Sequence, residues 1–138
     1  MKTVFIDTNV LLDIILKRKG WFDAVKLLDM SSSTLSFHIS ALTMANMAYI
    51  MRKALGKETL YDQLERMSQK LQVESLSTKA VEQAIALRAN DFEDALQYYC
   101  AMENKCDCIV TNNKKDFIYS SIPVLTPKEY LCEFSQPL

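Results

Sequence analysis

The chain has 138 residues, of which 49% are hydrophobic and 24% charged, and its formal net charge is −1. This length and composition are ordinary for one globular domain with a hydrophobic core, and we expect residues 1–138 to form a single domain. The near-neutral charge excludes a strongly basic nucleic-acid coat, so any contact with nucleic acid requires a local cationic surface.

The hydrophobic pattern predicts strands and helices that alternate along the chain. In chain order, we expect a strand at 2–6, helices at 9–17 and 21–30, a strand at 35–39, helices at 41–55 and 57–71, a strand at 72–76, helices at 78–89 and 92–104, strands at 108–110 and 123–125, and a last helix from Pro127. Because helices separate most of these strands, the strands pair in parallel through crossovers. The expected fold class is α/β, a three-layer α/β/α sandwich around a central parallel sheet of four to five strands.

Other features of the sequence exclude several classes of protein and active site. Asp7 ends the first apolar run too early for a secretory signal, and no run approaches the ~20 apolar residues of a membrane helix. Two glycines exclude a dinucleotide-binding or Walker phosphate loop. The single histidine, His38, is expected in a strand with its ring hydrogen-bonded, which disfavours a Ser-His-Asp nucleophile. The four cysteines lack disulfide-framework spacing and indicate reduced thiols in a cytoplasmic protein: Cys100, Cys106, Cys108 and Cys132.

Polar residues follow three of the predicted strands. In parallel sheets, ligands bind beyond the carboxyl ends of the strands, where the strand order reverses. Asp7 follows the first strand, Ser40 the second and Thr111 the fourth. If the first and fourth strands are neighbours, these side chains converge on one edge.

Each acidic segment allows more than one interpretation. Asp7 can cap the following helix, bind a metal ion, or act as an aspartyl-phosphate nucleophile, although Asn9 replaces the usual partner acid of that last mechanism. Asp91 and Asp94 can cap the helix that begins at 92, yet their spacing also puts both on one face. The segment 111–117 is either a polar loop or a source of oxygen ligands and positive charge.

Taken together, three carboxylate groups at element ends predict a site for one or two Mg²⁺ or Mn²⁺ ions. Such ions activate water and stabilise the leaving oxygen in phosphodiester cleavage. Clustered carboxylates repel one another unless cations are bound, so the cluster indicates a functional site.

Four segments occur in an order and spacing that resemble the PIN-domain nucleases, with the closest similarity to VapC-type toxins: Asp7–Asp13, Ser40–Asn46, Asp91–Ala95 and Val110–Phe117. The resemblance implies a parallel sheet flanked by helices and Mg²⁺- or Mn²⁺-dependent endoribonuclease activity. It also implies homodimers and, for toxin members, inhibition by a small antitoxin protein.

The resemblance assigns roles by motif. Asp7 matches the first metal-binding acid and Asp94 the third, with Asp91 as a helper; Asn113 matches the fourth position and Asp116 is the acid three residues later. The polar supports are then Thr8, Asn9 and Thr111. Apart from the motifs, Lys114 and Lys115 offer local positive charge for flanking phosphates, and Lys53 is a third candidate cation. Lys53 enters because a helical wheel puts it on one face with Asn46.

Asn46 departs from the pattern, which has Glu at this position. An amide oxygen can ligate a metal ion, but it adds no negative charge and cannot act as a base. Two hypotheses follow: a metal-dependent endoribonuclease that uses Asp7, Asp94, Asp116 and Asn46, and a catalytically weakened or inactive PIN module that binds RNA or a protein partner.

Overall fold

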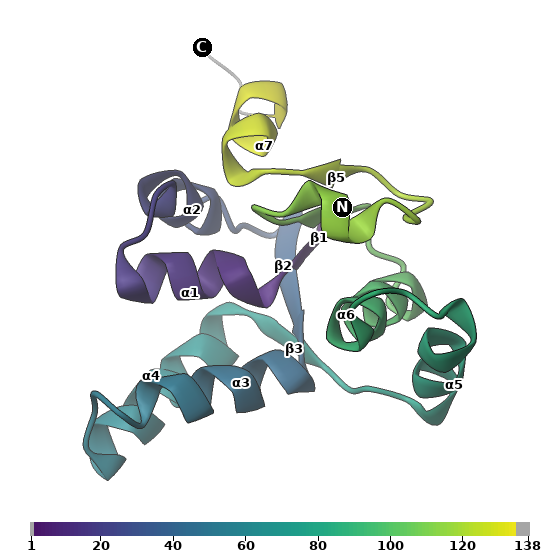
Figure 1. The fold of residues 1–138 in the computed structure, drawn as a ribbon. Helices are drawn as coiled ribbons and strands as arrows, with labels where there is room; N and C mark the ends of the chain where they lie inside the picture. The colour runs from purple at the N-terminus through teal and green to yellow at the C-terminus, as the bar shows by residue number, and fades with distance from the viewer. Residues whose placement is uncertain (1, 135–138) are drawn as a thin grey trace.

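The computed structural model describes residues 2–134, and these fold into a parallel sheet covered by helices on both sides (Figure 1). The elements in chain order are β1 (Lys2–Ile6), α1 (Thr8–Leu16), α2 (Trp21–Leu28), β2 (Leu35–Ser40), α3 (Ala41–Met51), α4 (Lys57–Lys70), β3 (Gln72–Glu74), α5 (Thr78–Leu87), α6 (Phe92–Glu103), β4 (Cys108–Val110), the 3₁₀ helix η1 (Lys114–Phe117), β5 (Val124–Leu125) and α7 (Pro127–Phe134).

The strand order is β3-β2-β1-β4-β5, and every neighbouring pair is parallel. The chain builds outward from β1 through β2 to β3, then returns to the other side of β1 for β4. The strand order therefore reverses between β1 and β4, which are paired through Val4–Cys108, Phe5–Ile109 and Ile6–Val110. This confirms the predicted sheet and places the ends of β1 and β4 side by side.

Alternating side chains of the central strands form two cores. Val4 and Ile6 pack in a cluster with residues of α1, α2, α3 and α7, whereas Phe5 packs with Tyr98 and Phe117 on the opposite face. Figure 1 shows α1 to α4 on one side of the sheet and α5 and α6 on the other. Strand side chains alternate between faces, and each large apolar residue buried in this way contributes about 1.5–3 kcal/mol. The three-layer prediction is confirmed.

The predicted helix at 41–55 was too long, because α3 ends at Met51. The backbone N–H groups of Ala54 and Leu55 both donate to the carbonyl of Met51 (3.0 Å each), so the chain turns there. Leu55 packs against the larger core cluster, and this burial draws the chain away from the helix axis. Lys53 consequently lies in a turn rather than on the helical face predicted for it.

Other elements lie within a few residues of their predicted bounds, except that residues 114–117 form η1 instead of an irregular loop. The ring of His38 is hydrogen-bonded to Ser36 and Glu74 (2.9 and 2.8 Å), as predicted. All four cysteines are free thiols, and burial raises the pKa of Cys100 and Cys106 to about 12. Across residues 2–134, no helix has the length and apolarity to span a bilayer.

Candidate functional site

A pocket of about 420 Å³ opens at the carboxyl end of the sheet, beside the point where the strand order reverses. We call it the acidic pocket. Four segments that are distant in sequence supply its lining: Asp7, Thr8, Asn9 and Leu12 from the end of β1 and α1; Asn46, Tyr49 and Ile50 from α3; Asp91, Glu93, Asp94 and Gln97 from the start of α6; and Asp116 from η1. The three acids predicted to act together thus share one pocket.

Asp7 lies at the bottom of this arrangement and is 3% exposed. Its backbone N–H donates to the carbonyl of Val110 (3.0 Å), and its Oδ2 accepts a hydrogen bond from Thr111 Oγ1 (2.8 Å). The pairing of β1 with β4 therefore fixes the position of the carboxylate. Asp7 makes no side-chain hydrogen bond that caps α1, so the capping interpretation is not what the structure shows.

Burial raises the pKa of Asp7 to about 6, although the hydrogen bonds from Thr111 and Thr8 oppose this rise. The pKa of half-buried Asp94 rises to about 7, because of burial and then repulsion from Asp7, Asp91 and Asp116. These shifts have the same physical basis: a carboxylate loses hydration and faces other carboxylates. Bringing these carboxylates together therefore costs folding free energy, and a bound cation would offset this cost.

Asp91 both caps α6 and lines the acidic pocket. Its Oδ1 accepts a hydrogen bond from the backbone N–H of Asp94 (2.9 Å), so it caps α6. It also lines the acidic pocket. The cap fixes the first turn of α6 and with it the position of Asp94.

The donor chemistry of the pocket fits a hard divalent cation, since carboxylate and amide oxygens are the ligands that Mg²⁺ and Mn²⁺ prefer. Within residues 2–134, however, no three His, Cys, Asp or Glu side chains stand close enough together to hold one ion without rearranging. A bound cation would have to draw Asp7, Asp94 and Asp116 closer together.

Glu93 is a pocket residue to which the sequence argument gave no role. Asn46 Nδ2 donates a hydrogen bond to Glu93 Oε1 (2.8 Å), which joins α3 to α6 across the pocket. The carboxylate of Glu93 thus lies beside the position where the family pattern has Glu and this chain has Asn46. The segment that opens α6 holds more acids than a helix cap requires, and this excess was the sequence signal that could have pointed to Glu93.

A buried polar network supports the pocket from below. Gln97 Oε1 accepts a hydrogen bond from Ser40 (2.7 Å), and Gln97 Nε2 donates to Thr8 (3.1 Å) and Thr43 (3.0 Å). Thr8 and Thr43 are also hydrogen-bonded to each other (2.7 Å). This network links α1 and α3 to α6, whose N-terminal end supplies Asp91, Glu93 and Asp94 to the pocket. Sequence reasoning missed Gln97, although its position one turn after Asp94 places it on the same helix face.

The predicted lysines lie outside the acidic pocket, and so does Asn113, the amide at the fourth position of the family pattern. Lys53 and Asn113 are exposed and do not line the acidic pocket. Lys114 Nζ lies 3.1 Å from a Glu129 carboxylate oxygen, at the start of α7. Lys115 lines a neighbouring pocket that shares Asp116 with the acidic pocket.

The raised pKa values predict how stability depends on pH. Asp7 binds a proton more tightly in the folded chain (pKa about 6) than in the unfolded chain (3.8), so its contribution becomes destabilising as the pH rises between these values. Asp7→Asn removes this contribution. In metal-free buffer we expect the variant to gain about 1–3 kcal/mol in unfolding free energy near pH 8, and little near pH 4. Urea denaturation at both pH values measures the difference, and an equal gain at both would contradict it.

The fold agrees with the comparisons to known proteins. The family model described as "PIN domain" matches residues 3–115, so the chain belongs to the PIN domain family. It is 31% identical over 139 residues to Ribonuclease VapC1 of Aquifex aeolicus (strain VF5), an alignment that covers 94% of this chain and 93% of that protein.

Solved structures share the fold. VapBC-1 from nontypeable Haemophilus influenzae superimposes with a TM-score of 0.73 at 13% identity and covers 91% of this chain and 98% of that one. DNA-bound VapBC from Salmonella typhimurium gives a TM-score of 0.71 at 20% identity, with 92% and 99% covered.

Proposed function

We propose that this chain is a divalent-metal-dependent endoribonuclease that acts as the toxin of a toxin–antitoxin pair. The observation that carries the proposal is the convergence of Asp7, Asp94 and Asp116, from three distant segments, on one pocket. The name of the Aquifex relative, a ribonuclease, supports the reaction class. A substrate of cellular RNA implies a cytoplasmic location.

In this proposal, Asp7, Asp94 and Asp116 would hold Mg²⁺ or Mn²⁺, with an oxygen of Asp91 as a further ligand. Asn113 lies outside the acidic pocket and would have to turn toward it to add its amide oxygen. The ion, when bound, supplies the positive charge that activates water and stabilises the leaving oxygen of the phosphodiester. Thr111 holds the Asp7 carboxylate in place through its hydrogen bond. Thr8 and Asn9, which line the pocket, orient substrate or water.

Positive side chains around the pocket neutralise the flanking phosphates of the RNA. Of the predicted cations, Lys115 is the one that lines a pocket together with Asp91, Asp94 and Asp116. Lys53 and Lys114 would act at a greater distance, and Lys114 would have to exchange its Glu129 partner for a phosphate. These contacts raise the affinity for RNA without distinguishing between base sequences.

Asn46 motivates the alternative, an inactive module that binds RNA or a protein partner. The hydrogen bond between Asn46 and Glu93 favours the active enzyme, since Glu93 adds beside Asn46 the carboxylate that Asn46 lacks. We therefore propose that Asn46 positions Glu93 and that the pocket keeps its full negative charge.

Incubating the purified chain with tRNA, rRNA and mRNA, with Mn²⁺ or Mg²⁺ present or chelated, tests the proposal. Metal-dependent cleavage of at least one RNA is expected. If no RNA is cut while a control nuclease works under the same conditions, the enzymatic function is refuted.

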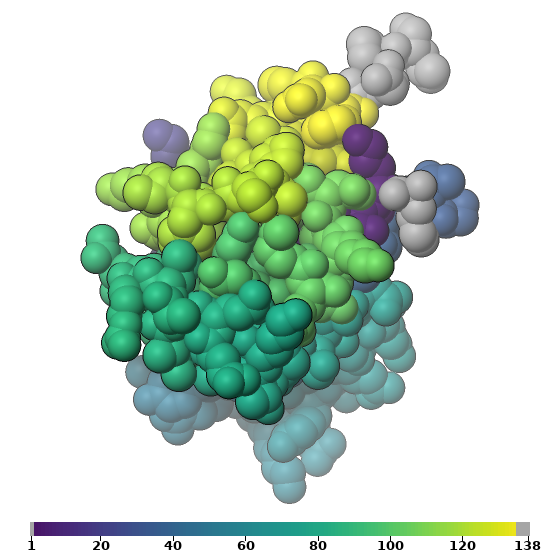
Figure 2. All heavy atoms as spheres, turned by 90° about the vertical axis from the view of Figure 1, so that its right-hand side faces the viewer, coloured from purple at the N-terminus to yellow at the C-terminus, as the bar shows by residue number. Residues whose placement is uncertain are grey.

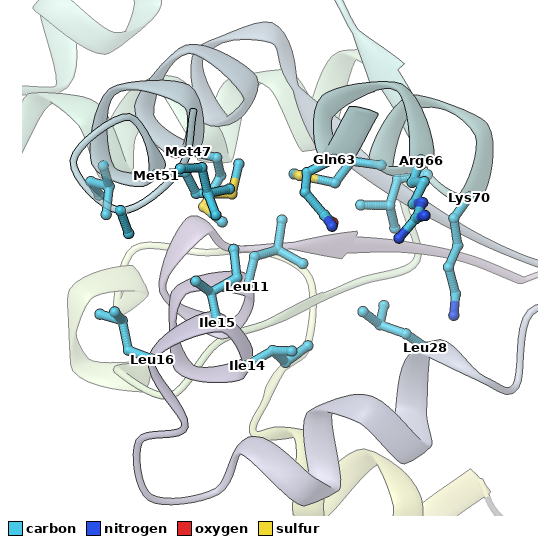
Figure 3. Close-up of a pocket in the computed structure, with 15 residues that line it drawn as sticks. Leu11, Ile14, Ile15, Leu16, Leu28, Met47, Met51, Gln63, Arg66 and Lys70 are labelled. Atoms are coloured by element: carbon cyan, nitrogen blue, oxygen red, sulfur yellow. The ribbon is translucent and has the colours of Figure 1, made fainter. Parts of the chain in front are cut away.

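The partner of this toxin would be a small antitoxin, as the solved neighbours suggest; one of them is a toxin–antitoxin complex from Klebsiella pneumoniae (TM-score 0.67, 23% identity, covering 90% of this chain and 97% of that one). An apolar groove of about 580 Å³ between α1, α3 and α4 fits such a partner (Figure 3). Ile15 and Leu16 in its wall are 42% and 53% exposed, and Arg66 and Lys70 flank it, with Lys70 paired to Asp29 (3.2 Å). These features suit a segment with apolar and acidic side chains. We also propose a homodimer, which light scattering would detect.

Ile15→Glu tests the groove. The change places a charge against an apolar partner surface and removes the burial of an Ile side chain, which is equivalent to about 10- to 100-fold in affinity. Tyr61→Glu is the control, because Tyr61 is 61% exposed on α4 but does not line the groove. Co-purification with the small protein encoded beside this chain should fail for Ile15→Glu and succeed for Tyr61→Glu. Equal recovery of the two complexes would remove the groove from the proposal.

A further inference from the structure

A second pocket, of about 280 Å³, adjoins the acidic pocket and shares Asp91, Asp94 and Asp116 with it. We call it the side pocket. The rest of its wall comes from two segments: Arg88, Ala89 and Asn90 between α5 and α6, and Lys115, Ile118 and Tyr119 from η1 and the residues after it. Figure 2 shows the yellow-green segment that contains Ile118 lying above the teal-green α5 and the turn that follows it.

Two exposed cations stand at the side pocket. Within residues 2–134, the charged nitrogens of Arg88 and Lys115 have no carboxylate oxygen within 4.0 Å. Their neighbour Lys114, in contrast, is paired with Glu129. Arg88 and Lys115 are therefore free to contact an anionic group beside a pocket that is otherwise acidic.

Tyr119 brings a polar group that lacks a partner. Its hydroxyl is buried and, within the described residues, has no hydrogen-bond partner. Its ring is held by Tyr98 and Phe117, with centroids 5.2 and 6.4 Å away. Buried polar groups are nearly always hydrogen-bonded, so this hydroxyl is available to donate to a bound water or ligand. Burial and the nearby aspartates raise the pKa of Tyr119, which keeps the hydroxyl protonated and able to donate.

Ile118 adds an apolar surface at the same place. Its side chain is 84% exposed, the highest value among the large hydrophobic residues that the structure describes. Water solvates this apolar side chain poorly, so covering it with another apolar surface is favourable. The flat face of a nucleobase is such a surface.

We infer that the side pocket binds the RNA nucleotide next to the scissile phosphate, an inference that rests on the proposed nuclease function. Arg88 and Lys115 contact the phosphate of this nucleotide, and Ile118 packs against its base. The remaining part of the nucleotide is its ribose, and the 2′-oxygen of the ribose accepts a hydrogen bond from the Tyr119 hydroxyl. The pocket volume lies just below the range typical of drug-sized ligands and so suits one nucleotide. Because the 2′-hydroxyl distinguishes RNA from DNA, Tyr119 is the residue that selects RNA.

The test compares binding of a short fluorescein-labelled single-stranded RNA and the DNA of the same sequence, by anisotropy in metal-free buffer. Arg88 is replaced with Asn, because its φ of 55° is left-handed and Asn tolerates that conformation. Lys105→Asn is the matched control, since Lys105 has a φ of 54° and lies beyond the opposite end of α6. Tyr119→Phe removes only the hydroxyl.

Arg88→Asn is expected to weaken RNA binding by about 3- to 10-fold and to reduce the salt dependence by about one counterion, whereas Lys105→Asn binds like the wild type. Tyr119→Phe is expected to reduce the preference for RNA over DNA. Its melting temperature should stay the same or rise, because the lost hydroxyl had no partner in the protein.

Wild-type RNA binding by Arg88→Asn, or an unchanged RNA preference in Tyr119→Phe, overturns the inference. Cleavage in Mn²⁺ is measured separately. If the wild type cuts RNA while both variants bind as it does, only the side pocket is refuted. If the wild type binds through these residues and cuts nothing, only the nuclease function is refuted. If it binds no RNA in metal-free buffer, the side pocket is refuted, and cleavage in Mn²⁺ alone decides the nuclease function.

Discussion

Asp94→Asn is expected to lower the rate of RNA cleavage by at least about 100-fold while the fold remains intact. Asn has nearly the same shape as Asp but carries no charge, so the pocket loses a negative charge that attracts the cation without losing packing. Asp7→Asn should act in the same way. Single-turnover cleavage of an RNA that the wild type cuts, with Mn²⁺ in excess, measures the loss.

Two comparisons separate this effect from misfolding. Asp62→Asn removes a charge from the exposed face of α4 and should leave cleavage unchanged. Asp94→Asn and Asp7→Asn should be at least as stable as the wild type in metal-free buffer near pH 8, because each removes a carboxylate whose pKa is raised. Cleavage within twofold of the wild type in both variants would show that these acids do not perform the chemistry.

Glu93→Gln is expected to lower cleavage by about 10- to 100-fold, and the added change Asn46→Glu is expected to restore much of it. The structure puts these two side chains within one hydrogen bond of each other, so a carboxylate at either position charges the same part of the pocket. Asn46→Glu alone would instead place two carboxylates in contact and should not increase cleavage.

Cleavage rates of the wild type, the two single variants and the double variant form a cycle that measures this exchange. A double variant no better than Glu93→Gln would show that the two positions are not equivalent. A large gain from Asn46→Glu alone would indicate that the natural pocket lacks a charge, as the inactive-module hypothesis requires.

The sheet was predictable from the sequence because its signals are local. Apolar runs such as 2–6 and 108–110 end abruptly at polar residues, and the helices between the strands require parallel pairing. The convergence of Asp7 and Thr111 then followed from the position of strand ends. The end of α3 was not predictable, since it depends on the tertiary packing of Leu55.

The site was predictable as a set of acids but not as a network. Capping and metal binding use the same residue types, and the structure shows that Asp91 caps α6 and lines the acidic pocket at once. Hydrogen bonds between side chains of different elements leave little pattern in the sequence, because the residues are far apart along the chain. The pairing of Asn46 with Glu93 and the three contacts of Gln97 join residues about 50 to 90 positions apart. Lys114 was assigned from its charge alone, and its pairing with Glu129 depends on the placement of α7.

Calorimetric titration of the wild type with Mn²⁺ addresses the shared cation site itself. One saturable binding event is expected near pH 8, weakening as the pH falls through about 7 and 6, since protons then compete for Asp94 and Asp7. The Asp7→Asn, Asp94→Asn double variant should show no such event. Equal Mn²⁺ binding by the double variant, or none by the wild type near pH 8, would contradict a metal site formed by these acids.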